Sequence, residues 1–254
     1  MDAIYEQCRE GIGDAETTEH LRQALRNGAD PNCSIPLTSK SYDMSPLVFA
    51  VVSRAPASIV RFLLEAGAET PGMILHLAAG VHAADHVEVL LAAGCAVDNL
   101  ATLDCNSKAT TALTFAIVKC AVPEEPSDVD VYGGSAPQPL ATVQALIRGG
   151  ADITRQIAPI GRYTYLHVVC SKPVCNSPLA CDLAHALLDA RVDVNMVNAV
   201  RGEQPLKFAL LWGTPRLAQI LIEAGADAFS EELMGTIQQP PLNTMVSLGK
   251  LEMV

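Results

Sequence analysis

Hydrophobic positions along the chain recur with the period of a short amphipathic helix. Between residues 57 and 67, one helical stripe is formed by Ile59, Val60, Phe62, Leu63 and Leu64. Gly67 follows it, and glycine ends helices readily because it takes the left-handed conformation without a Cβ penalty. A second stripe, before Gly225, consists of Leu217, Ile220, Leu221 and Ile222. The pattern predicts helices of about ten residues that stop at a glycine.

The end of this helical pattern is repeated along the chain. The six copies read ALRNGADPN (24–32), LLEAGAET (63–70), LLAAGCAVD (90–98), LIRGGADI (146–153), LLDARVDVN (187–195) and LIEAGADAF (221–229). Arg191 stands where the other copies have glycine, so this residue must adopt the left-handed conformation itself or its helix must end differently.

A second phrase precedes most copies and begins another predicted helix. It reads SPLVFA (45–50), MILHLA (73–78), TALTFA (111–116), TYLHVV (164–169) and QPLKFA (204–209). Together the two phrases resemble the ankyrin repeat, a β-turn followed by two helices with a T-P-L-H-x-A signature. The resemblance implies an all-α solenoid of stacked helix-turn-helix units with short β-turn fingers.

The spacing of the two phrases places the repeats and two insertions. We expect one domain over residues 1–254, with repeats near 1–32, 45–70, 73–98, 111–153, 164–196 and 204–229, and a partial seventh at 240–254. A Pro-, Gly- and acid-rich insertion at 122–139 reads as an exposed loop, and a shorter one spans 171–178. The seventh repeat lacks its second helix, so we expect the chain to continue or this uncapped end to contact a partner.

Composition and charge exclude several classes of function. Half of the residues are hydrophobic and only 4% are aromatic, which favours closely packed helices over a β-sandwich. The net charge is −11 and no cluster of five basic residues exists, so we expect no nucleic-acid partner. No apolar run of about 18 residues occurs, so we expect no membrane span. The eight cysteines and the charged N-terminus favour the cytosol, and the same reasoning fits the nucleus.

One group of residues matches the loose spacing of a zinc site. Cys170, Cys175, Cys181 and His185 form C-x4-C-x5-C-x3-H, within the pattern of CCCH zinc fingers. The repeat phase assigns these residues differently: Cys170 takes a small-residue position on a first helix, and His185 falls on the outer face of a second helix. We therefore expect ordinary thiols and no bound metal or cofactor, with a zinc-dependent RNA binder as the alternative.

The sequence predicts no catalytic residues. His76 and His167 occupy the signature histidine position, where the resemblance implies a hydrogen bond to the backbone of the next repeat. No P-loop, GxSxG, HExxH or GxGxxG motif occurs. We therefore expect a non-enzymatic protein.

The resemblance implies binding through the concave groove formed by the fingers and the first helices of the repeats. The repeat phase places nine partner-binding candidates there: Tyr42, Met44, Ser53, Lys108, Lys119, Tyr163, Lys172, Arg201 and Trp212. Trp212 is the only tryptophan, and Trp and Tyr are enriched at binding hot spots. Packing against the final half repeat is an alternative role for Trp212. We expect a protein–protein interaction module, a scaffold or adaptor. The alternative is a targeting or regulatory arm of a larger protein, with a catalytic domain beyond residue 254.

Overall fold

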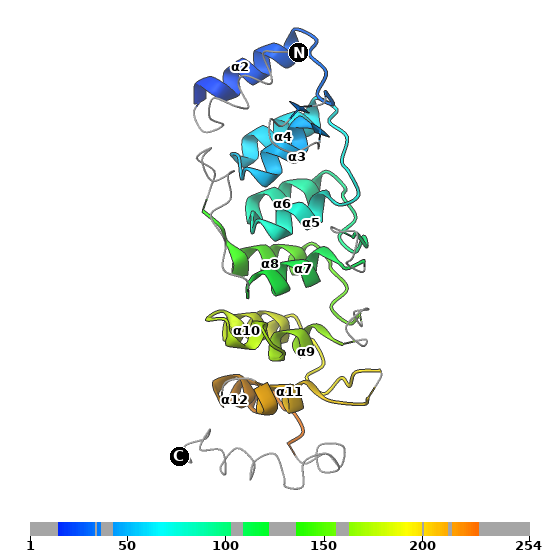
Figure 1. The fold of residues 1–254 in the computed structure, drawn as a ribbon, viewed down its shortest axis with the longest axis vertical. Helices are drawn as coiled ribbons and strands as arrows, with labels where there is room; N and C mark the ends of the chain where they lie inside the picture. The colour runs from blue at the N-terminus through cyan, green and yellow to red at the C-terminus, as the bar shows by residue number, and fades with distance from the viewer. Residues whose placement is uncertain are drawn as a thin grey trace.

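The computed structural model is an elongated stack of helix pairs (Figure 1). It describes residues 15–33, 35–36, 43–102, 109–121, 136–155, 163–199, 201–212 and 215–228. The first helices of the repeats are α3 (Pro46–Val52), α5 (Ile74–Gly80), α7 (Ala112–Lys119), α9 (Tyr165–Cys170) and α11 (Pro205–Trp212). The second helices are α2 (Ala15–Arg26), α4 (Ala57–Glu65), α6 (Ala84–Ala92), α8 (Pro139–Arg148), α10 (Ala180–Asp189) and α12 (Pro215–Glu223).

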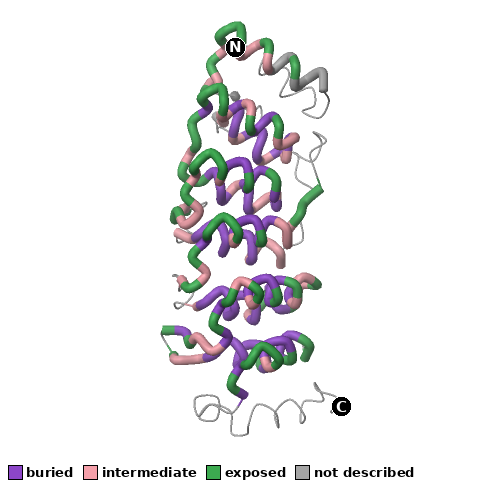
Figure 2. The backbone as a smooth tube through the Cα atoms, turned by 180° about the vertical axis from the view of Figure 1, so that it is seen from behind, coloured by how far each residue is buried: buried purple, intermediate pink, exposed green. Residues whose placement is uncertain are grey.

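The two kinds of helix form two layers with the core between them. First helices contact neighbouring first helices, and second helices contact neighbouring second helices from α4 to α12. The buried residues lie between the layers (Figure 2). The core leucine of the signature is at most 2% exposed in every copy: Leu47, Leu75, Leu113, Leu166 and Leu206. Alanines fill the remaining contacts, which lets adjacent helices approach closely.

Local chemistry sets where the helices begin and end. Thr111 and Thr164 cap α7 and α9, and each hydroxyl accepts a hydrogen bond from a backbone N–H in the first turn. At the end of α4, Gly67 N–H donates to Leu64 O and Ala68 N–H donates to Leu63 O, which is the Schellman pattern. Arg191 makes the same turn with φ of 69°, so this arginine adopts the left-handed conformation.

Hydrogen bonds between repeats fix how the pairs stack. His76 Nε2 bonds to Thr110 O and His167 Nε2 bonds to Glu203 O, both at 2.7 Å. Asn195 performs the same function between the second-helix loops, because its amide donates to Gly225 O and accepts from Asp227 N–H. The bonds of His76 and His167 are the ones that the signature histidine was expected to make.

The fingers contain little strand. β1 (Ile35–Pro36) pairs antiparallel with β2 (Asp43–Met44), and an isolated bridge joins Ala101 to Thr110. None of the helices in the described residues is long and apolar enough to cross a membrane.

The two insertions differ from the expectation in detail. Pro139, which was assigned to the first insertion, is the first residue of α8, and the Gln138 N–H donates to His82 O at 2.8 Å. Residues 138 and 139 therefore belong to the solenoid, whereas residues 122–135 lie outside the described residues. The second insertion contains a 3₁₀ turn, η2 (Val174–Asn176). The predicted half repeat at 240–254, and with it the expected uncapped end, also lies outside the described residues.

Candidate functional site

The first helices present one repeated surface, which we name the first-helix face. Its inner column is apolar in every copy and consists of Phe49, Leu77, Phe115, Val168 and Phe208. Four positions later, a residue that is still within the helix lies on the same side, because residues i and i+4 are neighbours on a helix. The outer positions are Ser53, Val81, Lys119, Lys172 and Trp212. Lys119 and Trp212 lie within their helices, whereas Lys172 lies beyond the end of α9.

The Phe115 ring lies directly over Gly80 of the preceding repeat. A Cβ built on Gly80 would come within 2.4 Å of Phe115 Cε1, so the ring occupies space that only glycine leaves open. The Lys119 ammonium lies 5.5 Å from the centre of the same ring. The apolar column of this face is therefore continuous from α5 to α7.

An aromatic cluster of Tyr163, His167, Phe208 and Trp212 covers the face at α9 and α11. Phe208 is its centre: its ring meets those of Tyr163 at 5.2 Å, His167 at 5.3 Å and Trp212 at 5.3 Å, each edge-on. Phe208 is buried, whereas Trp212 remains 43% exposed and its neighbour Leu211 45% exposed. The cluster thus holds one large ring in place while leaving almost half of it available for contact.

The second insertion ties the ends of three first helices together. Ser177 Oγ donates to Cys120 O, at the end of α7, and Cys175 Sγ donates to Trp212 O, at the end of α11, both at 3.0 Å. Lys172 precedes η2 and its side chain is exposed. Lys119, Lys172, Leu211 and Trp212 consequently lie along one border of the first-helix face, which we name the lysine–tryptophan edge.

The charges of the chain are distributed unevenly over the two layers. Within the part of the chain that the structure describes, the five first helices contain no Asp or Glu. Carboxylates lie instead on the second helices and on the loops that follow them. Neither Lys119 nor Lys172 forms an ion pair with a described residue. The first-helix face therefore combines apolar surface with positive charge on a chain that is acidic as a whole.

The structure brings together some of the predicted binding residues and not others. Tyr163 and Trp212 join the aromatic cluster, Lys119 and Lys172 lie on the lysine–tryptophan edge, and Arg201 is exposed on a finger turn. Met44 is half-buried in β2, apart from this group. Tyr42 and Lys108 lie outside the described residues.

The predicted exposure of Ser53 in the groove is wrong. Ser53 is only 4% exposed, and its hydroxyl donates to Phe49 O at 2.7 Å, one turn back along its own helix. A hydroxyl that satisfies itself in this way does not need to reach solvent or a partner.

Sequence reasoning overlooked three residues of this region. Phe208 and Leu211 escaped notice because apolar residues on a first helix are normally assigned to the core. Lys207, in the signature histidine position, forms a 2.8 Å ion pair with Glu203, and its side chain is only 7% exposed. The pair lowers the pKa of Glu203 against the raising effect of burial.

The residues of the candidate zinc site do not share one environment. Cys170 is fully buried, and burial raises the pKa of its thiol far above the ordinary value, whereas His185 is exposed on α10. Among the residues that the structure describes, no group of three or more His, Cys, Asp or Glu side chains is arranged to hold a metal ion. The repeat phase therefore describes these positions better than the zinc-finger spacing does.

The buried histidines are suited to structure rather than to proton transfer. Burial lowers the pKa of His76 and of His86, and it lowers the pKa of His167 to about 4. Each ring binds a backbone carbonyl of another repeat. A neutral imidazole fixed in this way holds neighbouring repeats in register.

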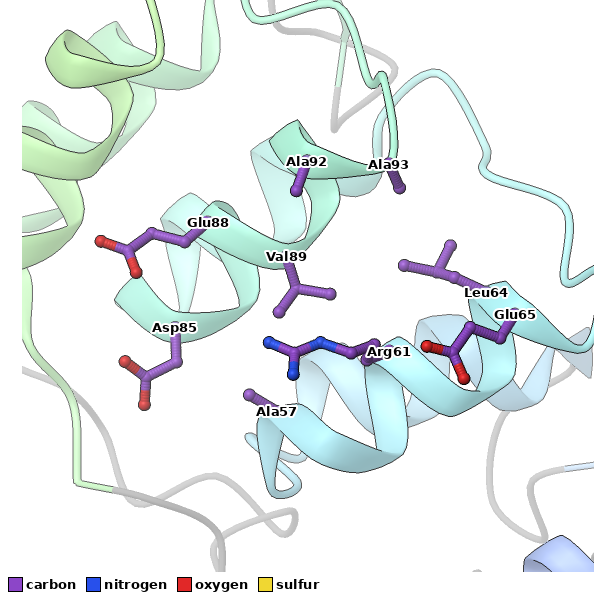
Figure 3. Close-up of a pocket in the computed structure, with 9 residues that line it drawn as sticks. All are labelled: Ala57, Arg61, Leu64, Glu65, Asp85, Glu88, Val89, Ala92 and Ala93. Carbon is purple, nitrogen blue, oxygen red and sulfur yellow. The ribbon is translucent and has the colours of Figure 1, made fainter.

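A groove lies on the other layer, between α4 and α6 (Figure 3). It has a volume of about 590 Å³, with Leu64 and Val89 among its apolar lining. Figure 3 shows Arg61 extending from α4 toward α6, where Asp85 lies. Its rim carries one basic side chain, Arg61, and three acidic ones, Glu65, Asp85 and Glu88, so it lacks the positive charge of the first-helix face, and its residues provide controls for that face.

Comparison with known proteins identifies the fold. No protein-family profile and no curated protein sequence matches the chain. Among solved structures, the chain is similar to the ankyrin repeat domain of Bcl-3, described as a unique member of the IkappaB protein family. The identity is 19% and the TM-score 0.58, over 96% of this chain and 97% of that one. The predicted all-α ankyrin-repeat solenoid is therefore confirmed as the fold.

Proposed function

We propose that this chain is a non-catalytic protein–protein interaction module that binds its partner through the first-helix face. The observation that carries the proposal is the exposed Leu211–Trp212 pair, which the aromatic cluster holds in place. Stacked repeats offer an extended, rigid surface of this kind, and the ankyrin fold is consistent with such a use. Because a fold does not determine a function, the argument rests on this surface.

The energetic contribution of Trp212 is large enough to matter. A tryptophan side chain has roughly 200 Å² of surface, so burying the exposed 43% at ~25 cal/mol per Å² contributes about 2 kcal/mol. Its ring is already positioned by Phe208 and its backbone by Cys175, so little side-chain freedom remains to be lost on binding. These are the properties of a hot-spot residue.

Affinity capture from cells with paired variants tests the proposal. The test variant is Leu211→Glu with Trp212→Glu, which places two charges on the face. The matched control is Ala92→Glu with Ala93→Glu, at exposed positions beside the groove of Figure 3. We expect a protein that wild type and control capture equally and that the test variant loses. Equal capture by all three would contradict the proposal.

The compartment is part of the same proposal. We place the chain in the cytosol or the nucleus, where thiols stay reduced. The six described cysteines, which are free thiols, support this placement.

A further inference from the structure

We propose that the lysine–tryptophan edge binds a segment of the partner that carries acidic residues next to an apolar side chain. This inference rests on the proposed function and names the chemistry of the partner. In it, the carboxylates pair with Lys119 and Lys172, and the apolar side chain packs on Leu211 and Trp212.

The second insertion gives the edge its shape. The first helices α3 and α5 end in a short turn through Arg54 and His82, which take φ of 54° and 53°. After α9 the chain instead leaves the helix, forms η2 and only then begins α10. The bonds from Ser177 and Cys175 anchor this detour to α7 and α11 on either side. The insertion therefore places Lys172 on an anchored segment between Lys119 and Trp212.

The sign of the charge selects the partner. Lys119 is the last residue of α7 and Lys172 follows the end of α9 by two residues, and the first helices beneath them carry no carboxylate to neutralise them. A basic segment would meet like charge at this edge. An acidic segment would form an ion pair with each of the two lysines.

The acidic character of the whole chain does not reverse this preference. Eight of the 16 carboxylates in the described residues lie on the second helices and none lies on the first helices, and packed helices are separated by about 8–10 Å. The Debye length at physiological ionic strength is about 8 Å, so those charges are strongly screened at the edge. An anionic membrane fits less well, because it would face the net charge of −11 with many lipids at once.

The apolar half of the proposal follows from the exposed side chains. Leu211 and Trp212 are adjacent in sequence and both are more than 40% exposed, on a helix whose other residues are buried. Trp212 contacts Phe208 edge-on, which leaves other parts of the indole available. A leucine or phenylalanine of the partner would pack on the exposed side of the aromatic cluster.

Trp212 also provides the assay, because it is the only tryptophan and its fluorescence reports on this edge alone. The probe is a short synthetic peptide in which Glu alternates with Leu and Phe, titrated into the full chain. Its matched control has Lys in place of every Glu. We expect saturable binding of the acidic peptide, with a change in Trp212 emission, and little binding of the basic one.

Charge reversal then isolates the lysines. Lys119→Glu with Lys172→Glu should weaken binding of the acidic peptide by about tenfold or more, a loss of about 1.4 kcal/mol. Arg61→Glu with Arg216→Glu changes the net charge equally, at exposed positions on α4 and α12, and should leave the affinity within about twofold. Circular dichroism of each variant verifies that the helices are retained.

Four results with the peptide or with vesicles would overturn the inference, and a fifth comes from affinity capture. The first is binding of the basic peptide that equals or exceeds that of the acidic one, and the second is unchanged affinity for the acidic peptide when the lysines are reversed. The third is tighter binding to vesicles of anionic lipid than to the acidic peptide. The fourth is binding of the acidic peptide that appears only after residues 122–135 are replaced. The last result would assign the edge to the chain's own acidic insertion. If the captured protein is lost with the Leu211 and Trp212 variant but not with lysine reversal, the proposed function survives and this inference fails.

Discussion

Acidification should destabilise the protein through His167 before any carboxylate contributes. The Nε2 of this buried ring bonds to Glu203 O at 2.7 Å, and its Nδ1 accepts from the Thr164 N–H at 3.3 Å. The Thr164 N–H makes Nδ1 an acceptor, so the ring is neutral with its proton on Nε2. A proton added to Nδ1 would face the Thr164 N–H and would have only the Thr164 hydroxyl oxygen, 2.7 Å from Nδ1, as an acceptor, in a site that burial has already made unfavourable to charge.

The size of the effect follows from the two states of the ring. Burial lowers the pKa of His167 from its ordinary 6.5 to about 4, although the bond to Glu203 opposes the shift. Between these values the unfolded chain takes up a proton that the folded chain refuses, so stability falls as the pH falls. One pKa unit corresponds to about 1.4 kcal/mol, which gives a loss of about 3 kcal/mol at most. Domains have free energies of unfolding of about 5–15 kcal/mol, so a loss of this size is readily measured.

Two other histidines add to this loss of stability, whereas the carboxylates affect stability only at lower pH. His76 and His86 also have lowered pKa values because they are buried, so they add to the loss below pH 6.5. The pKa of Glu203 is lowered by Lys207 and that of Asp152 by Thr154, so the stability that these carboxylates contribute is lost only below about pH 4.5.

Urea denaturation between about pH 7 and about pH 4.5 measures the slope. Wild type should lose stability steadily over this range. His167→Gln should be less stable at neutral pH, because its bonds are weakened, but should show a shallower slope by up to about 1.4 kcal/mol per pH unit. His185→Gln, at an exposed position on α10, is the matched control and should keep the wild-type slope. An unchanged slope in His167→Gln would refute the reasoning.

Three further predictions concern the backbone, the buried ion pair and the insertion. Arg191→Gly should raise the midpoint of thermal unfolding by relieving a φ of 69°, whereas Gly225→Ala, with open space around its Cβ, should cost about 1–2 kcal/mol from backbone strain alone. Lys207→Met should destabilise by about 1–3 kcal/mol, and adding Glu203→Gln should recover most of it in a double-mutant cycle. Replacing residues 122–135 with a short glycine-containing turn should leave the midpoint unchanged or raise it, and a large drop would show that they pack on the solenoid.

The repeat was predictable because its physical determinants are local. Most repeats have a core leucine and a glycine that ends a helix, and some repeats also have a threonine that caps one. Each of these residues acts on the backbone within a few positions of itself. The bond from His76 to the next finger follows from the repeat phase, since every repeat is placed identically against its neighbour. For Arg191, the sequence already left two possibilities: a left-handed conformation at this residue or a different end to its helix.

The candidate site was predictable only in part, because its character depends on contacts between repeats. Ser53 and Lys119 share a position in the repeat, yet the Ser53 hydroxyl bonds to the backbone of its own helix while the Lys119 ammonium lies over the Phe115 ring. The anchoring of the second insertion depends on Ser177 meeting α7 and Cys175 meeting α11, which no local pattern indicates. The segregation of carboxylates from the first helices becomes meaningful only when these helices are seen to form one face.

Amide hydrogen exchange of the full chain, alone and bound to the protein that it captures, tests the central claim most directly. Binding through the first-helix face predicts slowed exchange at the ends of α7 and α11, in η2 and around Tyr163. The amides of α4 and α6 that border the groove of Figure 3 should exchange at the same rate in both states. Protection confined to α4 and α6, with α11 and η2 unchanged, would contradict the account.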